Sequence, residues 1–221
     1  MRNGIRHLSG LAGLGLALLA LAACGHRDQR LVDQYFNAVN AKDNQTLGSF
    51  AAVGFDKKVD RWRIAKESDE EKAPIPLTDL VAKQKELDKA VAENKKAATA
   101  YSMDHYAEVT QVRDARAAGK PVPAKLAGVG SEWDKYNQKD RDLKKQLADA
   151  NAAVEREKRN LERSLGPTEN AEGLSGDMLT KRLDLVLTIN GQEQPYVMTL
   201  RKYDIKGGDR PRWVIQDLKP A

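Results

Sequence analysis

The most regular pattern of hydrophobic and polar positions lies between residues 78 and 165. In its second half, apolar side chains alternate at spacings of three and four: Trp133, Tyr136, Leu143, Leu147, Ala150, Val154 and Leu161. Its first half repeats this spacing with polar interruptions at Gln84 and Asn94: Leu77, Leu80, Leu87, Val91, Ala98 and Tyr101. Such spacing is typical of the a and d positions through which one helix packs on another. It predicts two long helices folded back as an antiparallel coiled-coil hairpin.

Residues that break helices mark the expected ends of the hairpin helices. The first should end at Gly119-Lys120-Pro121, because glycine followed by proline cannot continue a helix. The second should begin at Ser131, with Asp134 at the spacing of a capping box, and end at Leu165-Gly166-Pro167. A phase slip before Val109 indicates a stutter in the first helix.

The turn of this hairpin is expected near Lys125. Residues equidistant from the turn should then face each other, which places Val91 opposite Leu161 and Ala98 opposite Val154. The contacts of the hairpin are expected to lie mostly within its own seam.

The segments on either side of the hairpin predict a small α+β body. Apolar positions in residues 28–40 recur at helical spacing after Asp28, a candidate N-cap, and a second short helix follows Asp43. A strand is expected around Trp62. After Pro167 come three strands that alternate apolar and polar positions, with turns at Asn190-Gly191 and Gly207-Gly208: residues 179–189, 196–205 and 212–218.

Together these patterns predict an antiparallel sheet of three to four strands, covered by the N-terminal helix and interrupted by the hairpin. The body halves would be residues 24–76 and 167–221, and the hairpin 77–166. The Tyr-Phe-x-Ala-Val helix from Tyr35 to Asp43 and the closing strand from Trp213 to Leu218 resemble the nuclear-transport-factor-2-like, or cystatin-like, superfamily. That resemblance implies a helix packed on a curved sheet.

The N-terminus has the pattern of a bacterial secretion signal. Arg2 and Arg6 precede an apolar run from Leu8 to Ala23, which is too short to span a bilayer. The run ends in Leu-Ala-Ala-Cys, which resembles the lipobox, where the cysteine is lipidated and the peptide before it is removed. Residues 1–23 are therefore expected to be a lipoprotein signal peptide and Cys24 the lipidation site, with an ordinary signal peptide as the alternative.

Cys24 is the only cysteine, so no intramolecular disulfide is available and lipidation accounts for it. Several acyl chains on one residue would hold the protein on a membrane. Gly25 follows where an aspartate would resemble the inner-membrane retention signal of enteric bacteria. We therefore expect the periplasmic face of the outer membrane.

Charge and composition argue against several classes of function. Removal of Arg2 and Arg6 with the signal peptide lowers the formal charge from +5 to +3, and both signs alternate along the hairpin. This pattern is typical of a solvated helical surface rather than of a nucleic-acid site. Three histidines occur in the chain, and His105 lies within a charged helix, so neither a metal nor another cofactor is expected.

No catalytic constellation is recognisable, so we do not expect an enzyme. The favoured hypothesis is a lipid-anchored envelope protein that uses its hairpin as an interaction module or spacer. The hairpin tip offers candidate contacts for a protein partner: Arg113, Arg116, Lys120 and Lys125. One alternative is a small-ligand-binding module whose pocket is lined by Tyr35, Phe36, Trp62 and Trp213. Another resembles the efflux-pump adaptors, which dock an outer-membrane channel through a hairpin tip.

Overall fold

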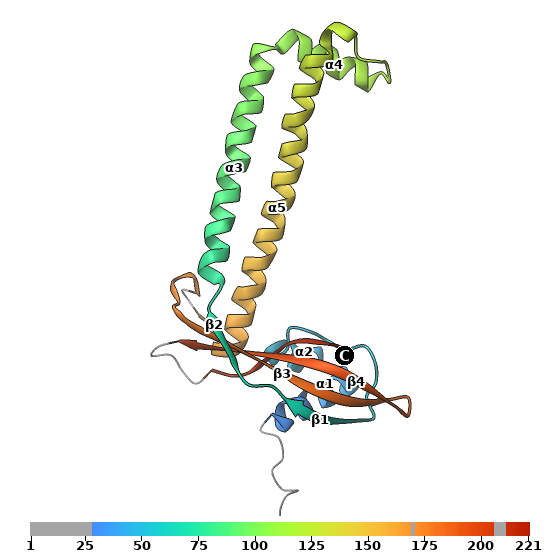
Figure 1. Ribbon diagram of the computed structural model, residues 1–221, viewed down its shortest axis with the longest axis vertical. Helices are drawn as coiled ribbons and strands as arrows, with labels where there is room; N and C mark the ends of the chain where they lie inside the picture. The colour runs from blue at the N-terminus through green and yellow to red at the C-terminus, as the bar shows by residue number, and fades with distance from the viewer. Residues whose placement is uncertain (1–27, 169–170, 206–210) are drawn as a thin grey trace, which may run out of the picture.

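The computed structural model describes residues 28–168, 171–205 and 211–221 (Figure 1). The signal peptide, Cys24 and the expected Gly207-Gly208 turn lie outside these residues. The fold is α+β with an antiparallel sheet, as the sequence predicts. Its elements are α1 (Gln29–Ala41), α2 (Asn44–Phe50), β1 (Arg61–Glu67), β2 (Glu71–Pro74), α3 (Leu77–Asp104), α4 (Tyr106–Ala117), η1 (Ala124–Leu126), α5 (Ala127–Leu165), η2 (Ala171–Gly173), β3 (Gly176–Ile189), β4 (Gln192–Ile205) and β5 (Val214–Pro220).

The sheet has five strands, where the sequence predicts three to four. Its order is β1-β3-β4-β5, and β2 pairs with the first part of β3, from Glu71 opposite Thr180 to Pro74 opposite Asp177. All four residues of β2 are exposed, so this edge strand has no alternation of apolar and polar positions that could reveal it. β1 and β2 precede α3, α4 and α5 in the chain, and the other strands follow them.

A tight turn between β3 and β4 sets the register of the longest strand pair. Asn190 and Gly191 both have positive φ angles, 52° and 77°, as a two-residue type I′ turn requires. The two strands then pair along their full length, from Ile189 opposite Gln192 to Gly176 opposite Ile205. This predicted turn is confirmed.

One face of the sheet packs against α1 and α2. Tyr35 and Phe36 of α1 are fully buried in a cluster with side chains that alternate along β3 and β4. The strand residues of this cluster are Leu183, Leu185, Leu187, Ile189, Tyr196, Met198 and Leu200. Asp28 stands at the N-cap of α1, but its side chain makes no capping bond and instead forms a buried ion pair with Lys181.

The opposite face of the sheet packs against the base of the long helices. Tyr203 of β4 is an odd number of residues from Leu200 and therefore points to the other side. It is fully buried in a second cluster with Leu77 of α3 and with Val154 and Leu161 of α5. The contacts of the helices lie mostly within their own seam, as expected, but their base also shares a core with the sheet.

We refer to residues 77–165, which include α3, α4 and α5, as the arm (Figure 1). The expected stutter is a break: α3 ends at Asp104, His105 has φ −119° and ψ 35°, and α4 begins at Tyr106. α4 ends close to the predicted Gly119, and α5 ends at Leu165 before Gly166, as predicted. α5 begins at Ala127, however, four residues before the expected Ser131.

The arm helices are antiparallel, but the predicted register is wrong. Gln84 of α3 donates to Asn151 of α5 over 2.7 Å, so residues whose numbers sum to about 235 face each other. The predicted pairs, such as Ala98 with Val154, sum to 252 and lie about 25 Å apart along the arm at 1.5 Å per residue. The error arises because α4 occupies the tip as a separate helix, so α3 and α5 are not joined by a single turn near Lys125.

Candidate interaction site on the arm

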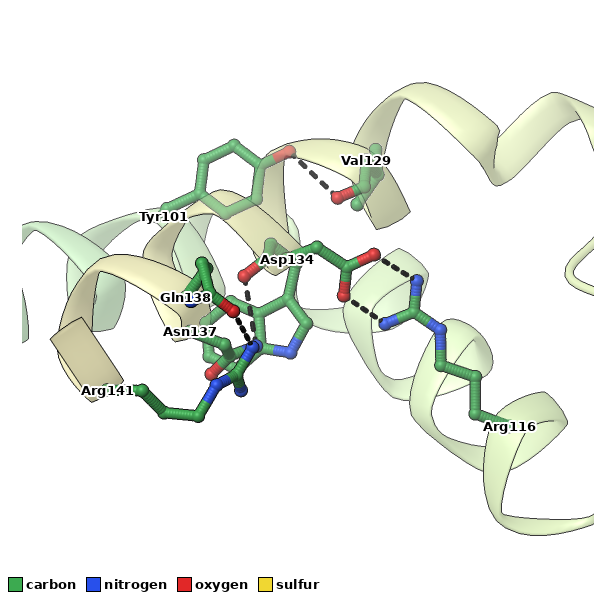
Figure 2. Close-up of polar contacts among 8 residues, drawn as sticks. Tyr101, Arg116, Val129, Asp134, Asn137, Gln138 and Arg141 are labelled. Carbon is green, nitrogen blue, oxygen red and sulfur yellow. Dashed lines mark hydrogen bonds and ion pairs between the residues drawn. The ribbon is translucent and has the colours of Figure 1, made fainter.

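The outer end of the arm is built by α4 packing on the first turns of α5. Val109 and Val112 of α4 are buried, and a Cβ added to Gly130 would lie 3.5 Å from Val112. Arg116 of α4 donates two hydrogen bonds to the carboxylate of Asp134 on α5, of 2.5 and 2.7 Å (Figure 2). Asp134 is therefore a partner of α4 and not the capping residue that the sequence predicts.

The four basic residues predicted at the tip differ in their contacts. Arg116 is engaged by Asp134. Arg113, Lys120 and Lys125 are exposed, and in the described part of the chain none has an ion-pair partner. The structure therefore uses one of the four cations to fix α4 and leaves the other three in solvent.

An apolar groove lies between α3 and α5, just below the tip. Its volume is about 710 Å³. Met103 and Tyr106, at the junction of α3 and α4, border it and are each 72% exposed, while Trp133 and Tyr136 of α5 are half-buried. We call this surface the tip groove; its other lining residues are Val91, Asn94, Lys95, Ala98, Thr99, Ser102, Asn137, Asp140 and Lys144.

Sequence reasoning missed Met103 and Tyr106 because both fall off the heptad pattern. Trp133 and Tyr136 were recognised, but as residues of the helix seam. Met103 and Tyr106 flank the break at His105, for which the phase slip before Val109 is the signal in the sequence. Exposed large apolar side chains grouped together mark interaction surfaces in soluble proteins.

Polar and aromatic contacts hold the two walls of the tip groove in register. Asn94 of α3 is buried and donates to the carbonyl of Tyr136 over 3.2 Å. The rings of Tyr101 and Tyr136 lie 5.4 Å apart, and the Tyr101 hydroxyl donates to the carbonyl of Val129 over 3.5 Å (Figure 2). A buried polar residue in a seam costs stability but specifies one alignment.

A second polar network fixes the base of the arm to the sheet. Glu157 of α5 is buried, and its carboxylate accepts hydrogen bonds from the Tyr203 hydroxyl, 2.8 Å, and from Arg201, 3.1 Å. Burial and the nearby charge of Glu157 raise the pKa of Tyr203 above its usual range. Ser164 adds a bond from its hydroxyl to the carbonyl of Arg212, 2.7 Å. The arm therefore meets the body at a defined orientation.

Three of the four aromatic residues suggested for a ligand pocket pack in or against the core, whereas Trp213 packs against the core and also lines a hollow beside Arg212. Tyr35 and Phe36 are fully buried, and burial raises the pKa of Tyr35 to about 12. Trp62 packs 5.2 Å from Phe36 and donates to Asp33 over 2.8 Å. A hollow of about 870 Å³ beside α1 and α2 is lined by other residues, including Asn40, Lys42, Leu47, Phe55 and Lys58.

Neither a metal centre nor a membrane span is found among the residues that the structure describes. Within these ranges no three His, Cys, Asp or Glu side chains are grouped so that they could hold a metal ion. None of the described helices combines the length and apolar character needed to cross a membrane.

Comparison with known proteins gives no relative for this chain. No protein-family description, no curated protein and no solved structure matches it. The case for function therefore depends on the residues and their geometry.

Proposed function

We propose that this protein is a lipid-anchored lipoprotein of the bacterial envelope, without enzymatic activity, that presents its arm to a protein partner. In this proposal Cys24 carries the anchor and residues 77–165 form an interaction module inserted into the α+β body. The observation that carries the proposal is the tip groove, an exposed apolar surface held at the far end of a rigid arm.

The position of the anchor relative to the arm supports this proposal. α1 begins at Gln29, five residues after Cys24, and packs on one face of the sheet, whereas the arm meets the other face. In Figure 1 the arm rises above the sheet, and the blue start of α1 lies at the lower side of the body. α5 has 39 residues and is about 58 Å long at 1.5 Å per residue. A body anchored near α1 would therefore hold the tip groove tens of ångströms away from the membrane.

The dimensions and charges of the tip groove fit a partner helix with an apolar stripe. On α3 and α4 the groove extends from Val91 to Tyr106, about 22 Å at 1.5 Å per residue, which is the length of a helix of about 15 residues. Lys95 and Lys96 beside it are exposed and have no ion-pair partner among the described residues. Acidic side chains flanking the stripe of the partner would complement them.

The two alternatives have less support. The resemblance to the nuclear-transport-factor-2-like superfamily stays a prediction, and three of the aromatics suggested for its ligand pocket, Tyr35, Phe36 and Trp62, are engaged in the core. An adaptor-like role would place the contact at the basic tip, where Arg116 is already paired.

Photo-crosslinking in intact cells tests the interaction. A photoreactive residue at Met103 should give a discrete product with another envelope protein, identified by mass spectrometry. The same residue at Ala148, exposed on α5 outside the groove, is the matched control. Absence of any product at Met103, or equal products at both positions, would contradict the docking role. A product of twice the chain mass would identify a second copy as the partner.

Membrane fractionation tests the anchor separately. The Cys24→Ser variant should accumulate as unprocessed or soluble protein. Recovery of this variant at the mature mass with membranes that have been washed in high salt, which screens ionic contacts, would show that Cys24 does not anchor the chain.

A further inference from the structure

A strongly basic surface adjoins the start of α1. Two neighbouring hollows, of about 620 and 420 Å³, share Ser49 and Arg212. Their cationic side chains come from α1, the end of α5, β4 and the segment before β5: Arg30, Arg159, Arg163, Lys202 and Arg212. We call these five residues the basic surface. The carboxylates that line the same hollows are Asp28, which is paired with Lys181, and Glu162. Outside the hollows, Glu70 lies 3.9 Å from the ammonium group of Lys202.

Two of these cations are held in place by the fold. Arg163 donates from Nε to the carbonyl of Gly48 over 3.1 Å, and Arg212 donates from Nη2 to the carbonyl of Arg163 over 3.1 Å. Burial and the neighbouring charge of Arg159 lower the pKa of Arg163. The guanidinium groups of Arg163 and Arg212 are therefore held close to other positive charges. Among the described residues, neither of them has a carboxylate partner. An external anion would relieve their repulsion.

A tryptophan belongs to the same surface. Trp213 is partly buried, and the ammonium groups of Lys181 and Lys202 lie 4.7 and 4.6 Å from the centre of its ring. Tryptophan beside lysine and arginine is the residue combination that proteins place at the headgroup level of a membrane.

The proposed anchor would bring this surface to the membrane. Asp28 lines the hollow next to Arg30 and is four residues from Cys24. Four extended residues span at most about 14 Å. With lipid on Cys24, the start of α1 cannot move farther than this from the bilayer, and acyl chains with a basic patch bind a membrane more firmly than one chain alone.

We infer that the basic surface binds the anionic phospholipid headgroups of the membrane that holds the anchor, and that it orients the arm away from that membrane. This inference rests on the proposed function, because lipidation of Cys24 is what would place the surface next to the membrane. The test of the inference does not depend on lipidation, because binding can be measured with the chain that carries no lipid.

The test uses the mature chain with Cys24→Ser and two kinds of vesicle at low salt. One contains phosphatidylcholine alone, and the other contains one-third phosphatidylglycerol. The chain should bind the second kind and not the first. The double variant R30E/R159E should bind at least 30-fold more weakly, since each of the two lost cations contributes roughly 1 kcal/mol near a charged membrane and the new carboxylates are repelled by it. Both residues are exposed, so circular dichroism should show an unchanged fold.

The matched control is K139E/K145E, which makes the same change of charge at exposed positions on the arm. It should bind like the parent chain. Equal weakening by the two double variants, or no preference of the parent chain for the anionic vesicles, would overturn the inference. Fluorescence of Trp213 in a W62F/W133F background adds an independent readout, because its emission should shift to the blue only with anionic vesicles.

Absence of vesicle binding in these assays would contradict the basic surface but not the proposed lipidation of Cys24. Conversely, membrane recovery of Cys24→Ser in cells that survives a high-salt wash would contradict the anchor, whereas recovery that high salt or R30E/R159E abolishes would support the basic surface. The two proposals therefore fail in different experiments.

Discussion

Replacing Leu161 with alanine tests whether the arm and the body form one folding unit. Leu161 lies on α5 near its base and is fully buried in the cluster that includes Tyr203 and Leu77. Its neighbours therefore come from the sheet as well as from α3. A cavity here would weaken the junction of arm and body, not only the helix pair.

The expected cost of L161A follows from its burial. Leucine-to-alanine changes in protein cores cost about 2–5 kcal/mol, and the cost is highest where neighbours cannot collapse into the cavity. Tyr203 is held by its hydrogen bond to Glu157 and by strand pairing, so collapse is restricted. We expect about 3–5 kcal/mol. L147A, at a half-buried position in the arm, should cost less than about 2 kcal/mol.

Urea unfolding followed by two probes measures the effect. Far-UV circular dichroism is dominated by the arm helices, and fluorescence of Trp62 and Trp213 reports the body in a W133F background. L161A should shift both transitions to lower urea together. K144A, on an exposed residue paired with Asp140, serves as the control and should shift neither by more than about 1 kcal/mol. If L161A moves the helical signal alone, the arm and body unfold independently and the shared core is not cooperative.

Three further changes probe the polar contacts and the register. E157A should cost about 3 kcal/mol in urea unfolding because it leaves the buried Tyr203 hydroxyl without its acceptor, and E157Q should cost less. G191A should cost about 1 kcal/mol in thermal unfolding because alanine is strained at a φ of 77°, and an unchanged melting temperature would contradict this. Cysteines at Gln84 and Asn151, in the Cys24→Ser background, should be joined within one chain by a short bifunctional thiol reagent; exclusively intermolecular products would mean that arms of two copies pair.

Local patterns were sufficient to predict much of the body. β3 and β4 alternate apolar and polar residues over many positions, and Asn190-Gly191 restricts the hairpin to one turn type, so neither needs distant information. β2 could not be predicted, because its four exposed residues are held only by pairing with β3. Its existence depends on a partner strand about a hundred residues away in the chain.

The arm shows where sequence periodicity stops being informative. The apolar spacing identifies which residues of α5 face a partner, but many alignments of two similar heptad patterns bury comparable surface. The alignment of α3 with α5 is set by the hydrogen bond from Asn94 to the carbonyl of Tyr136 and by the packing of α4 against Gly130 of α5. The packing of α4 follows the break at His105, which the sequence shows only as a slip in phase. The candidate site was missed for the same reason, since Met103 becomes exposed beside that break.

Polar interruptions in the heptads mark the places where each helix changes its contacts. Glu157 stands at a seam position of α5, yet it bonds to Tyr203 of the sheet and not to α3. A leucine there would fill the seam but leave the Tyr203 hydroxyl buried without a partner. Asn94 has the same role near the tip, where a leucine would permit several alignments of α3 and α5. Buried polar contacts therefore set the alignment of the helices at both ends of the arm, and the apolar seam holds the helices together between these ends. Such an arrangement keeps the tip groove at a fixed position relative to the body, as an arm that presents a docking surface requires.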